Sequence, residues 1–327
     1  MKTVTLARHA MATRFEIVLH GDNESALRAA GEEALDEIER LDSQLSFYDP
    51  HSQTSRLNAL AARQPVRVEP RLFDLLKRAR DLHDQLDGAF DITVAPLMKL
   101  WGFAGGTGRV PSDEDLESTR AKVGMHHVRL NDSACTVSFD REGVLLDLGA
   151  IGKGYALQEA VEILRDAEIE SAFLHGGTST AYALGSPPDA DAWKIAVERP
   201  EFSERAMLQP DSVTEADRDG ANLTAIPLRD EGISVSAIWG KGFQSRDRTY
   251  GHVLDPCKGR PTEGAAMAAV VSKSATDTDA MATGLLTLGS AGLLKLVAPS
   301  SGIRALVAER TSEPGGFQIE TLGIETP

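Results

Sequence analysis

Cysteine is nearly absent from this chain of 327 residues, which contains only Cys135 and Cys257. Two cysteines cannot form the multiple disulfides that stabilise small secreted domains, and two free thiols in a reducing compartment is the simpler interpretation. Long apolar runs are also missing, because no stretch reaches the roughly 18 residues that a membrane-spanning helix needs. The sequence therefore excludes a disulfide scaffold and predicts no membrane span.

Positive charge is scarce. Lys and Arg together number 34 against 49 Asp and Glu, which gives a formal net charge of −15. Such a surface repels nucleic-acid phosphates, so we expect no nucleic-acid partner. Backbone amides or a metal ion could still hold a small anionic ligand locally. The N-terminal residues lack the apolar segment and cleavage site of a signal peptide; taken as the whole gene product, the chain is expected to be cytoplasmic.

Hydrophobic residues make up 42% and charged residues 25% of the chain, which is ordinary for a globular protein. Apolar periodicity predicts helices over 70–86, from Lys153 onward and over 277–288. The predicted strands cluster in hairpin-like groups between these helices, which favours an α+β fold. Residues 199–231 are polar and aperiodic. We therefore expect one domain over 1–327, with a surface excursion near 199–231.

The most informative segment runs from Asp147 to Ala156, with the sequence Asp-Leu-Gly-Ala-Ile-Gly-Lys-Gly-Tyr-Ala. A predicted strand over 144–148 leads into an acid, a glycine-rich turn and a helix with Lys153 in its first turn. The free N–H groups of a helix start suit phosphate, and glycine lets the backbone approach a ligand closely. The spacing matches neither a Walker loop nor the dinucleotide fingerprint. An ordinary strand-to-helix turn explains this segment equally well when it is taken alone.

A second segment places Asp279 and Thr283 four residues apart in a predicted helix, so both side chains share a face. A carboxylate beside a hydroxyl offers hard oxygen ligands suited to Mg²⁺. Helix capping is the alternative. In a third segment, His252 precedes an Asp-Pro turn; its side chain could act as a general base or be structural.

Two upstream segments carry aromatic residues beside turns. They run over 46–58 and 88–103, and each is compatible with ordinary packing. The chain has only 3 Trp and 4 Tyr, so few side chains could stack on an aromatic ligand. Tyr48 is the first candidate for that role and Trp101 the second.

Together, and in this order, these segments resemble the ApbE family of flavin transferases, which move FMN from FAD to a protein threonine. The resemblance covers nearly the whole chain, from Met11-Ala-Thr13 to Leu288-Gly289, and includes His175-Gly-Gly177 and Gly259-Arg-Pro261. It implies a single ApbE-like, T-fold-like α+β domain built of two closely packed α/β subdomains. The chain departs from the family pattern at Thr178 and at Ser236-Ala-Ile-Trp239, which affects substrate detail more than the core of the site.

The resemblance also implies roles for particular residues. His252 matches the position proposed to take the proton from the acceptor hydroxyl. The metal-binding positions match Ala150 and Ala282 through their carbonyls, together with Asp279 and Thr283. The positions that contact FAD match Met11, Tyr48, Ala89, Phe90, Asp91, Asp147, Lys153 and Val253.

The implied activity is that of an FAD:protein FMN transferase. FAD is the substrate, Mg²⁺ assists phosphoryl transfer, and the partner is an acceptor protein with a Thr or Ser hydroxyl. Three alternatives remain: an FAD pyrophosphatase that releases FMN and AMP to water, a flavin-binding protein without turnover, and a protein unrelated to flavin whose motifs are coincidental.

Overall fold

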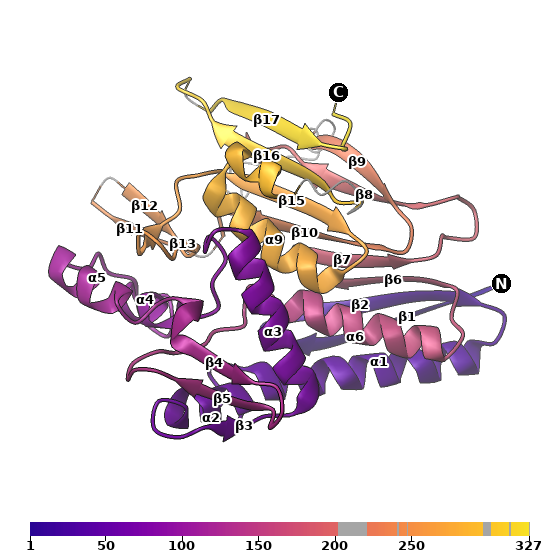
Figure 1. Cartoon of the computed structure of the whole chain (residues 1–327). Helices are drawn as coiled ribbons and strands as arrows, with labels where there is room; N and C mark the ends of the chain where they lie inside the picture. Colours follow the sequence, from indigo (N-terminus) through magenta and orange to yellow (C-terminus); the bar gives the residue numbers. More distant parts are fainter. Residues whose placement is uncertain (202–220, 241, 247, 297–301, 314, 327) are drawn as a thin grey trace.

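The computed structural model describes residues 1–201, 221–240, 242–246, 248–296, 302–313 and 315–326. Within these ranges, eight strands form one antiparallel sheet (Figure 1). From one edge to the other, the strands are β1 (Lys2–Ala10), β2 (Thr13–Gly21), β6 (Ser171–Gly176), β7 (Thr180–Leu184), β10 (Glu231–Ala237), β15 (Met267–Ser272), β16 (Arg304–Arg310) and β17 (Phe317–Leu322).

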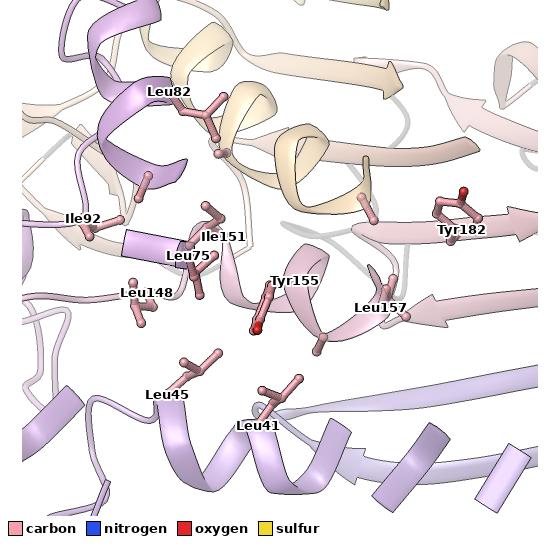
Figure 2. Close-up of a cluster of buried hydrophobic side chains, with 14 of the residues drawn as sticks. Leu41, Leu45, Leu75, Leu82, Ile92, Leu148, Ile151, Tyr155, Leu157 and Tyr182 are labelled. Atoms are coloured by element: carbon pink, nitrogen blue, oxygen red, sulfur yellow. The ribbon is translucent and has the colours of Figure 1, made fainter. Parts of the chain in front are cut away.

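Helices cover one face of this sheet. They are α1 (Glu24–Leu45), α6 (Gly152–Asp166) and α9 (Ala275–Leu288), while α3 (Pro70–Gln85) lies across them (Figure 1). Each helix turns an apolar stripe inward, as in α1, where Leu27, Leu35 and Ile38 are buried. The resulting core includes the side chains around the start of α6, among them Leu148, Ile151 and Tyr155 (Figure 2). The functional segments therefore rest on a packed core.

A second, smaller core lies on the opposite face of the sheet. It is covered by the hairpin of β8 (Trp193–Glu198) and β9 (Asn222–Leu228). Strand β7 is buried on both faces, because Ala181 and Ala183 face this hairpin while Tyr182 and Leu184 face the helices.

The remaining elements are short. A small antiparallel sheet joins β3 (Val66–Arg67), β5 (Thr136–Phe139) and β4 (Val128–Asn131). Two hairpins follow β10 and lead the chain toward β15. They pair β11 (Gly242–Ser245) with β12 (Arg248–Gly251), and β13 (Leu254–Asp255) with β14 (Arg260–Pro261). The short helices are α2 (Gln53–Leu60), α4 (Ala95–Leu100), α5 (Asp113–Arg120) and α10 (Leu293–Leu296).

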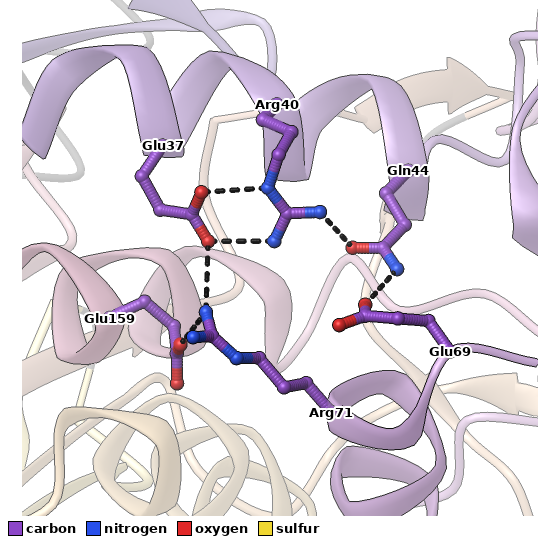
Figure 3. Close-up of polar contacts among 6 residues, drawn as sticks. All are labelled: Glu37, Arg40, Gln44, Glu69, Arg71 and Glu159. Atoms are coloured by element: carbon purple, nitrogen blue, oxygen red, sulfur yellow. Dashed lines mark hydrogen bonds and ion pairs between the residues drawn. The ribbon is translucent and has the colours of Figure 1, made fainter. Parts of the chain in front are cut away.

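A network of charged and amide side chains joins α1, α3 and α6 where these helices meet (Figure 3). Arg71 is its centre, with its guanidinium 3.4 Å from Glu37 on α1 and 3.1 Å from Glu159 on α6. The network ties together three helices that are far apart in sequence. Its members are Glu37, Arg40, Gln44, Glu69, Arg71 and Glu159.

The structure confirms the α+β class and the predicted helices near 70–86, 153 and 277–288. The strand predicted over 144–148 is wrong. Leu146 exchanges both of its backbone hydrogen bonds with the side-chain amide of Asn58, and the Asp147 amide donates to the Ile92 carbonyl at 2.7 Å. The segment is held by one side chain and one loop carbonyl instead of by a neighbouring strand.

Part of the range 199–231, expected as a polar excursion, is β9. Its side chains Leu223, Ile226 and Leu228 are buried against the second core. Residues 202–220 lie outside the described residues. Among the helices that are described, none combines the length and apolar character required to cross a bilayer.

Candidate functional site

The glycine-rich turn is built by the backbone hydrogen bonds of Asp147 and its neighbours. The Asp147 carboxylate accepts a hydrogen bond from the Gly149 amide at 2.8 Å, and the amides of Ile151 and Gly152 donate to the Leu148 carbonyl. Helix α6 then begins at Gly152 without a side-chain cap. Of its first amides, Gly152 is paired with the Leu148 carbonyl and Gly154 with the Asp279 carboxylate of α9, so the helix start offers an anion fewer free N–H groups than the sequence predicts.

Asp279 lies at the centre of the contact between α6 and α9. The residue is only 4% exposed, and its carboxylate accepts a hydrogen bond from the Gly154 amide at 3.0 Å. The hydroxyl of Thr180, on β7, donates to its other oxygen at 3.4 Å. The Lys153 ammonium lies 3.6 Å from that same oxygen. The acid predicted to bind metal and the lysine predicted to face phosphate are therefore neighbours, although they are distant in sequence.

Thr283 lies one turn after Asp279 on the same helix. Its hydroxyl donates to the Asp279 carbonyl at 3.2 Å, and the hydroxyl of Ser236, at the end of β10, lies 3.4 Å away. The shared helix face predicted for Asp279 and Thr283 is confirmed. Ala150 is half-buried in the turn before α6, and Ala282 is fully buried within α9. Inside a helix the Ala282 carbonyl already accepts an amide hydrogen bond, so only its second lone pair is available.

These oxygens fit Mg²⁺. A carboxylate, a hydroxyl and a loop carbonyl are hard ligands, and Mg²⁺ keeps several waters or phosphate oxygens besides one or two protein groups. Among the described residues, no group of three or more His, Cys, Asp and Glu side chains is placed to hold a metal ion. A site with a single carboxylate suits an ion that shares its coordination with a substrate phosphate.

Asp147 and Tyr48 interact electrostatically. Burial raises the pKa of Asp147, and the Gly149 amide and the Lys153 charge only partly counteract it. Desolvation and the negative charge of Asp147 raise the pKa of Tyr48, although 68% of this tyrosine is exposed. An exposed aromatic ring near the glycine-rich turn is available to pack on a planar ligand.

Trp101, the other aromatic candidate, is not available in that way. It is fully buried, and its indole N–H donates to the Gly259 carbonyl at 2.8 Å. Trp101 is therefore a structural residue that anchors the turn after β13.

The segment Ala89–Asp91 is buried and carries its own hydrogen-bond network. Asp91 accepts hydrogen bonds from the amide and the hydroxyl of Thr93 at 2.7 and 2.6 Å. Its other carboxylate oxygen lies 3.3 Å from Nδ1 of His83, at the end of α3. Sequence reasoning missed His83, because its proximity to Asp91 depends on how the chain turns between them.

Met11 lies in the two-residue turn between β1 and β2. Met11 and Ala12 both have positive φ, 49° and 57°, and Ala10 pairs with Thr13. This conformation is that of a tight hairpin turn. The turn therefore brings Met11 to the end of the sheet, and its side chain packs against the main core.

Val253 packs against the same core, and its carbonyl accepts a hydrogen bond from the Thr262 amide at 2.9 Å. His252 is half-buried and follows Gly251, whose α-carbon abuts the backbone of Ile238.

Two further residues of the site were not singled out in the sequence. Gly154 lies in the glycine-rich segment that the sequence analysis singled out, so the glycine itself is the signal that could have identified this position. Thr180 carries no sequence signal, because its role depends on its position on a central strand.

Comparison with known proteins agrees with this geometry. The sequence matches the ApbE family over residues 11–307. It is 30% identical to a curated FAD:protein FMN transferase of Vibrio cholerae over 286 residues, covering 86% of this chain and 79% of the relative. It is 27% identical to a transferase of the same name from Salmonella typhimurium, covering 75% of this chain and 67% of that protein.

The fold is also that of solved ApbE structures. The ApbE protein of Thermotoga maritima superposes with a TM-score of 0.83 at 27% identity, covering 98% of this chain and 96% of the other. The flavin transferase ApbE of Vibrio cholerae gives a TM-score of 0.82 at 27% identity, with coverages of 98% and 97%. The chain belongs to the ApbE family.

Proposed function

We propose that this protein is an FAD:protein FMN transferase that moves FMN from FAD to a Ser or Thr hydroxyl of an acceptor protein and releases AMP. The observation that carries the proposal is the meeting of Asp279 with Gly154 and Lys153 at the start of α6. This arrangement joins a candidate metal ligand to a helix start that suits phosphate, in a chain of the ApbE family.

Asp279, Thr283 and the Ala150 carbonyl would hold Mg²⁺, with Ala282 as a weaker candidate because its carbonyl lies within the helix. When bound, the ion neutralises charge on the pyrophosphate of FAD. Lys153 is close enough to Asp279 to add a positive charge beside the same phosphate oxygens.

The nucleotide itself would be held by the remaining predicted contacts. The exposed ring of Tyr48 is available to pack on a planar part of FAD. Met11 in the hairpin turn, the 89–91 segment, Asp147 and Val253 would form the rest of the contact surface. The assignment of these residues to the FAD contact surface is supported by the family match and by their positions in the structure.

The transfer step needs a base. In our proposal His252 takes the proton of the acceptor hydroxyl, whose oxygen then attacks the FMN phosphorus. The bond from that phosphorus to the bridging oxygen breaks, and AMP leaves with the electron pair. The nucleophile comes from the partner, so no side chain of this protein becomes modified.

Incubation of the purified protein with FAD, Mg²⁺ and a Thr-bearing acceptor tests the proposal. We expect flavin fluorescence on the acceptor that survives denaturing electrophoresis, with one AMP released per flavin attached. The His252→Ala variant should lose FMN transfer but still bind FAD. The His126→Ala variant, which makes the same replacement at another position, is the control and should keep transfer. AMP release at an equal rate without acceptor would favour an FAD pyrophosphatase, and tight FAD binding without AMP would favour a flavin-binding protein.

A further inference from the structure

We infer that His83 is a positioning residue that fixes the 89–91 segment for its nucleotide, an inference that rests on the proposed function. His83 lies in the last turn of α3, outside every segment assigned to the site above. Its Nδ1 lies 3.1 Å from the Phe90 carbonyl oxygen and 3.3 Å from an Asp91 carboxylate oxygen. Both of these are acceptors, so Nδ1 carries the proton and holds two consecutive residues at once.

The other end of the segment is fixed as well. Asp91 is 6% exposed, and its second oxygen accepts two hydrogen bonds from Thr93. The Thr93 hydroxyl in turn accepts a hydrogen bond from the Gly124 amide at 2.6 Å. His83, Asp91, Thr93 and Gly124 therefore form one continuous chain of hydrogen bonds.

This chain determines which groups the segment offers to a ligand. The Asp91 carboxylate is buried, and both of its oxygens already have protein donors in His83 and Thr93. The Ala89 amide donates to the Leu86 carbonyl at 3.0 Å, so what remains for the nucleotide is the Ala89 carbonyl and the adjoining main chain, whose orientation His83 sets through the Phe90 carbonyl. A main-chain surface binds tightly only when it is held rigid before the ligand arrives.

His83 is also accessible from the solvent side. It lines a cavity of about 590 Å³ together with Arg120, His126 and Cys257. Removal of the imidazole would leave a space that opens into this cavity, so a small imidazole added to the solution can reach it. His126 lines the same cavity, and among the described residues no hydrogen bond or ion pair joins its side chain to the 89–91 segment, which makes it a matched control.

The test is the dissociation constant of FAD, measured with Mg²⁺ by flavin fluorescence for the wild type, His83→Ala, His83→Asn and His126→Ala. Loss of the shared Nδ1–H hydrogen bond, one branch of which reaches a carboxylate, should weaken FAD binding by the alanine variant about tenfold. Asparagine keeps a donor near Nδ1 and should recover most of the affinity, and millimolar imidazole should partly restore the alanine variant. The histidine control should bind like the wild type.

The loss should appear in KM for FAD more than in kcat, because His83 does not touch the reacting atoms. Melting curves without FAD check that each variant is folded, and the asparagine variant keeps the test valid if the alanine variant is not. If the wild type binds FAD and a folded His83→Ala variant binds it with equal affinity, the inference about His83 is overturned while the proposed function stands. A wild type that binds no FAD would overturn the proposed function, and this inference with it.

Discussion

Gly154 donates its backbone N–H to the buried carboxylate of Asp279, and this hydrogen bond ties the first turn of α6 to the middle of α9. A Cβ atom at residue 154 would lie 2.1 Å from the Ala275 carbonyl oxygen and 2.8 Å from the Asp279 Cβ. The two helices approach so closely that only glycine fits, and the closeness brings the candidate metal ligand to the glycine-rich turn.

Gly154→Ala should therefore separate the two helices. We expect a loss of about 1–3 kcal/mol in the free energy of unfolding, measured with urea, and weaker FAD binding. Gly152→Ala is the control in the same helix, because the nearest atom to its new methyl group lies 3.9 Å away on Leu45. Equal stability of the two variants would contradict the packing argument.

The Asp279→Ala variant should lose the dependence of AMP release from FAD on Mg²⁺. We expect AMP release to fall by about a hundredfold, because the variant lacks the only carboxylate among the proposed ligands. Asp277→Asn is the control on the same helix, since Asp277 pairs with Arg78 instead. Chromatography of released AMP over a range of Mg²⁺ concentrations gives the measurement, and unchanged AMP release by the alanine variant would refute a catalytic metal at this position.

Tyr48→Ala should weaken FAD binding several-fold to about tenfold, as expected for the loss of one aromatic contact. Tyr48→Phe keeps the ring and should bind FAD like the wild type. Because Tyr48 is 68% exposed, neither change should move the melting temperature of the ligand-free protein. If phenylalanine and alanine weaken binding equally, the hydroxyl and not the ring makes the contact.

Asp147 should make stability depend on pH. Its folded-state pKa is raised by burial, so the folded protein holds a proton there more tightly than the unfolded chain does. This contribution is fully present below the unfolded value of about 4 and is lost as pH rises through the raised folded pKa.

Asp147→Asn removes the titration and keeps an oxygen for the Gly149 amide. The variant should therefore gain stability relative to the wild type as pH rises from about 3.5 to 8, in paired urea unfolding experiments. A stability difference that stays constant over this range would show that Asp147 ionises in the fold as readily as in the unfolded chain.

Local periodicity predicted the elements that carry the metal candidates. Asp279 and Thr283 share a helix face because their four-residue spacing fits the helical repeat, and the glycine-rich segment leads into α6 as expected. Strand β7 was not predicted, because its five buried residues show no alternation of polar and apolar side chains and lack the valines that mark the equally buried β15. Its Thr180, a partner of Asp279, was missed for the same reason.

Contacts that depend on turns were beyond the sequence. His83 reaches Asp91 because Asp87 and Gly88 both have positive φ, 50° and 79°, and reverse the chain after α3. The strand predicted over 144–148 has a strand's apolar composition but lacks a strand partner, since the Asn58 side chain occupies the backbone groups of Leu146. The apolar composition of a segment predicts that it is buried. Whether it pairs as a strand depends on which other segment of the chain lies beside it.

The two hydrogen bonds of the Asn58 amide tie α2 to the segment that leads into the glycine-rich turn, although 88 residues separate Asn58 from Leu146. An aspartate at position 58 has the same shape but no N–H₂ group, so it would set a negative oxygen against the Leu146 carbonyl. The replacement of one nitrogen by oxygen would therefore uncouple the glycine-rich turn from its support on α2.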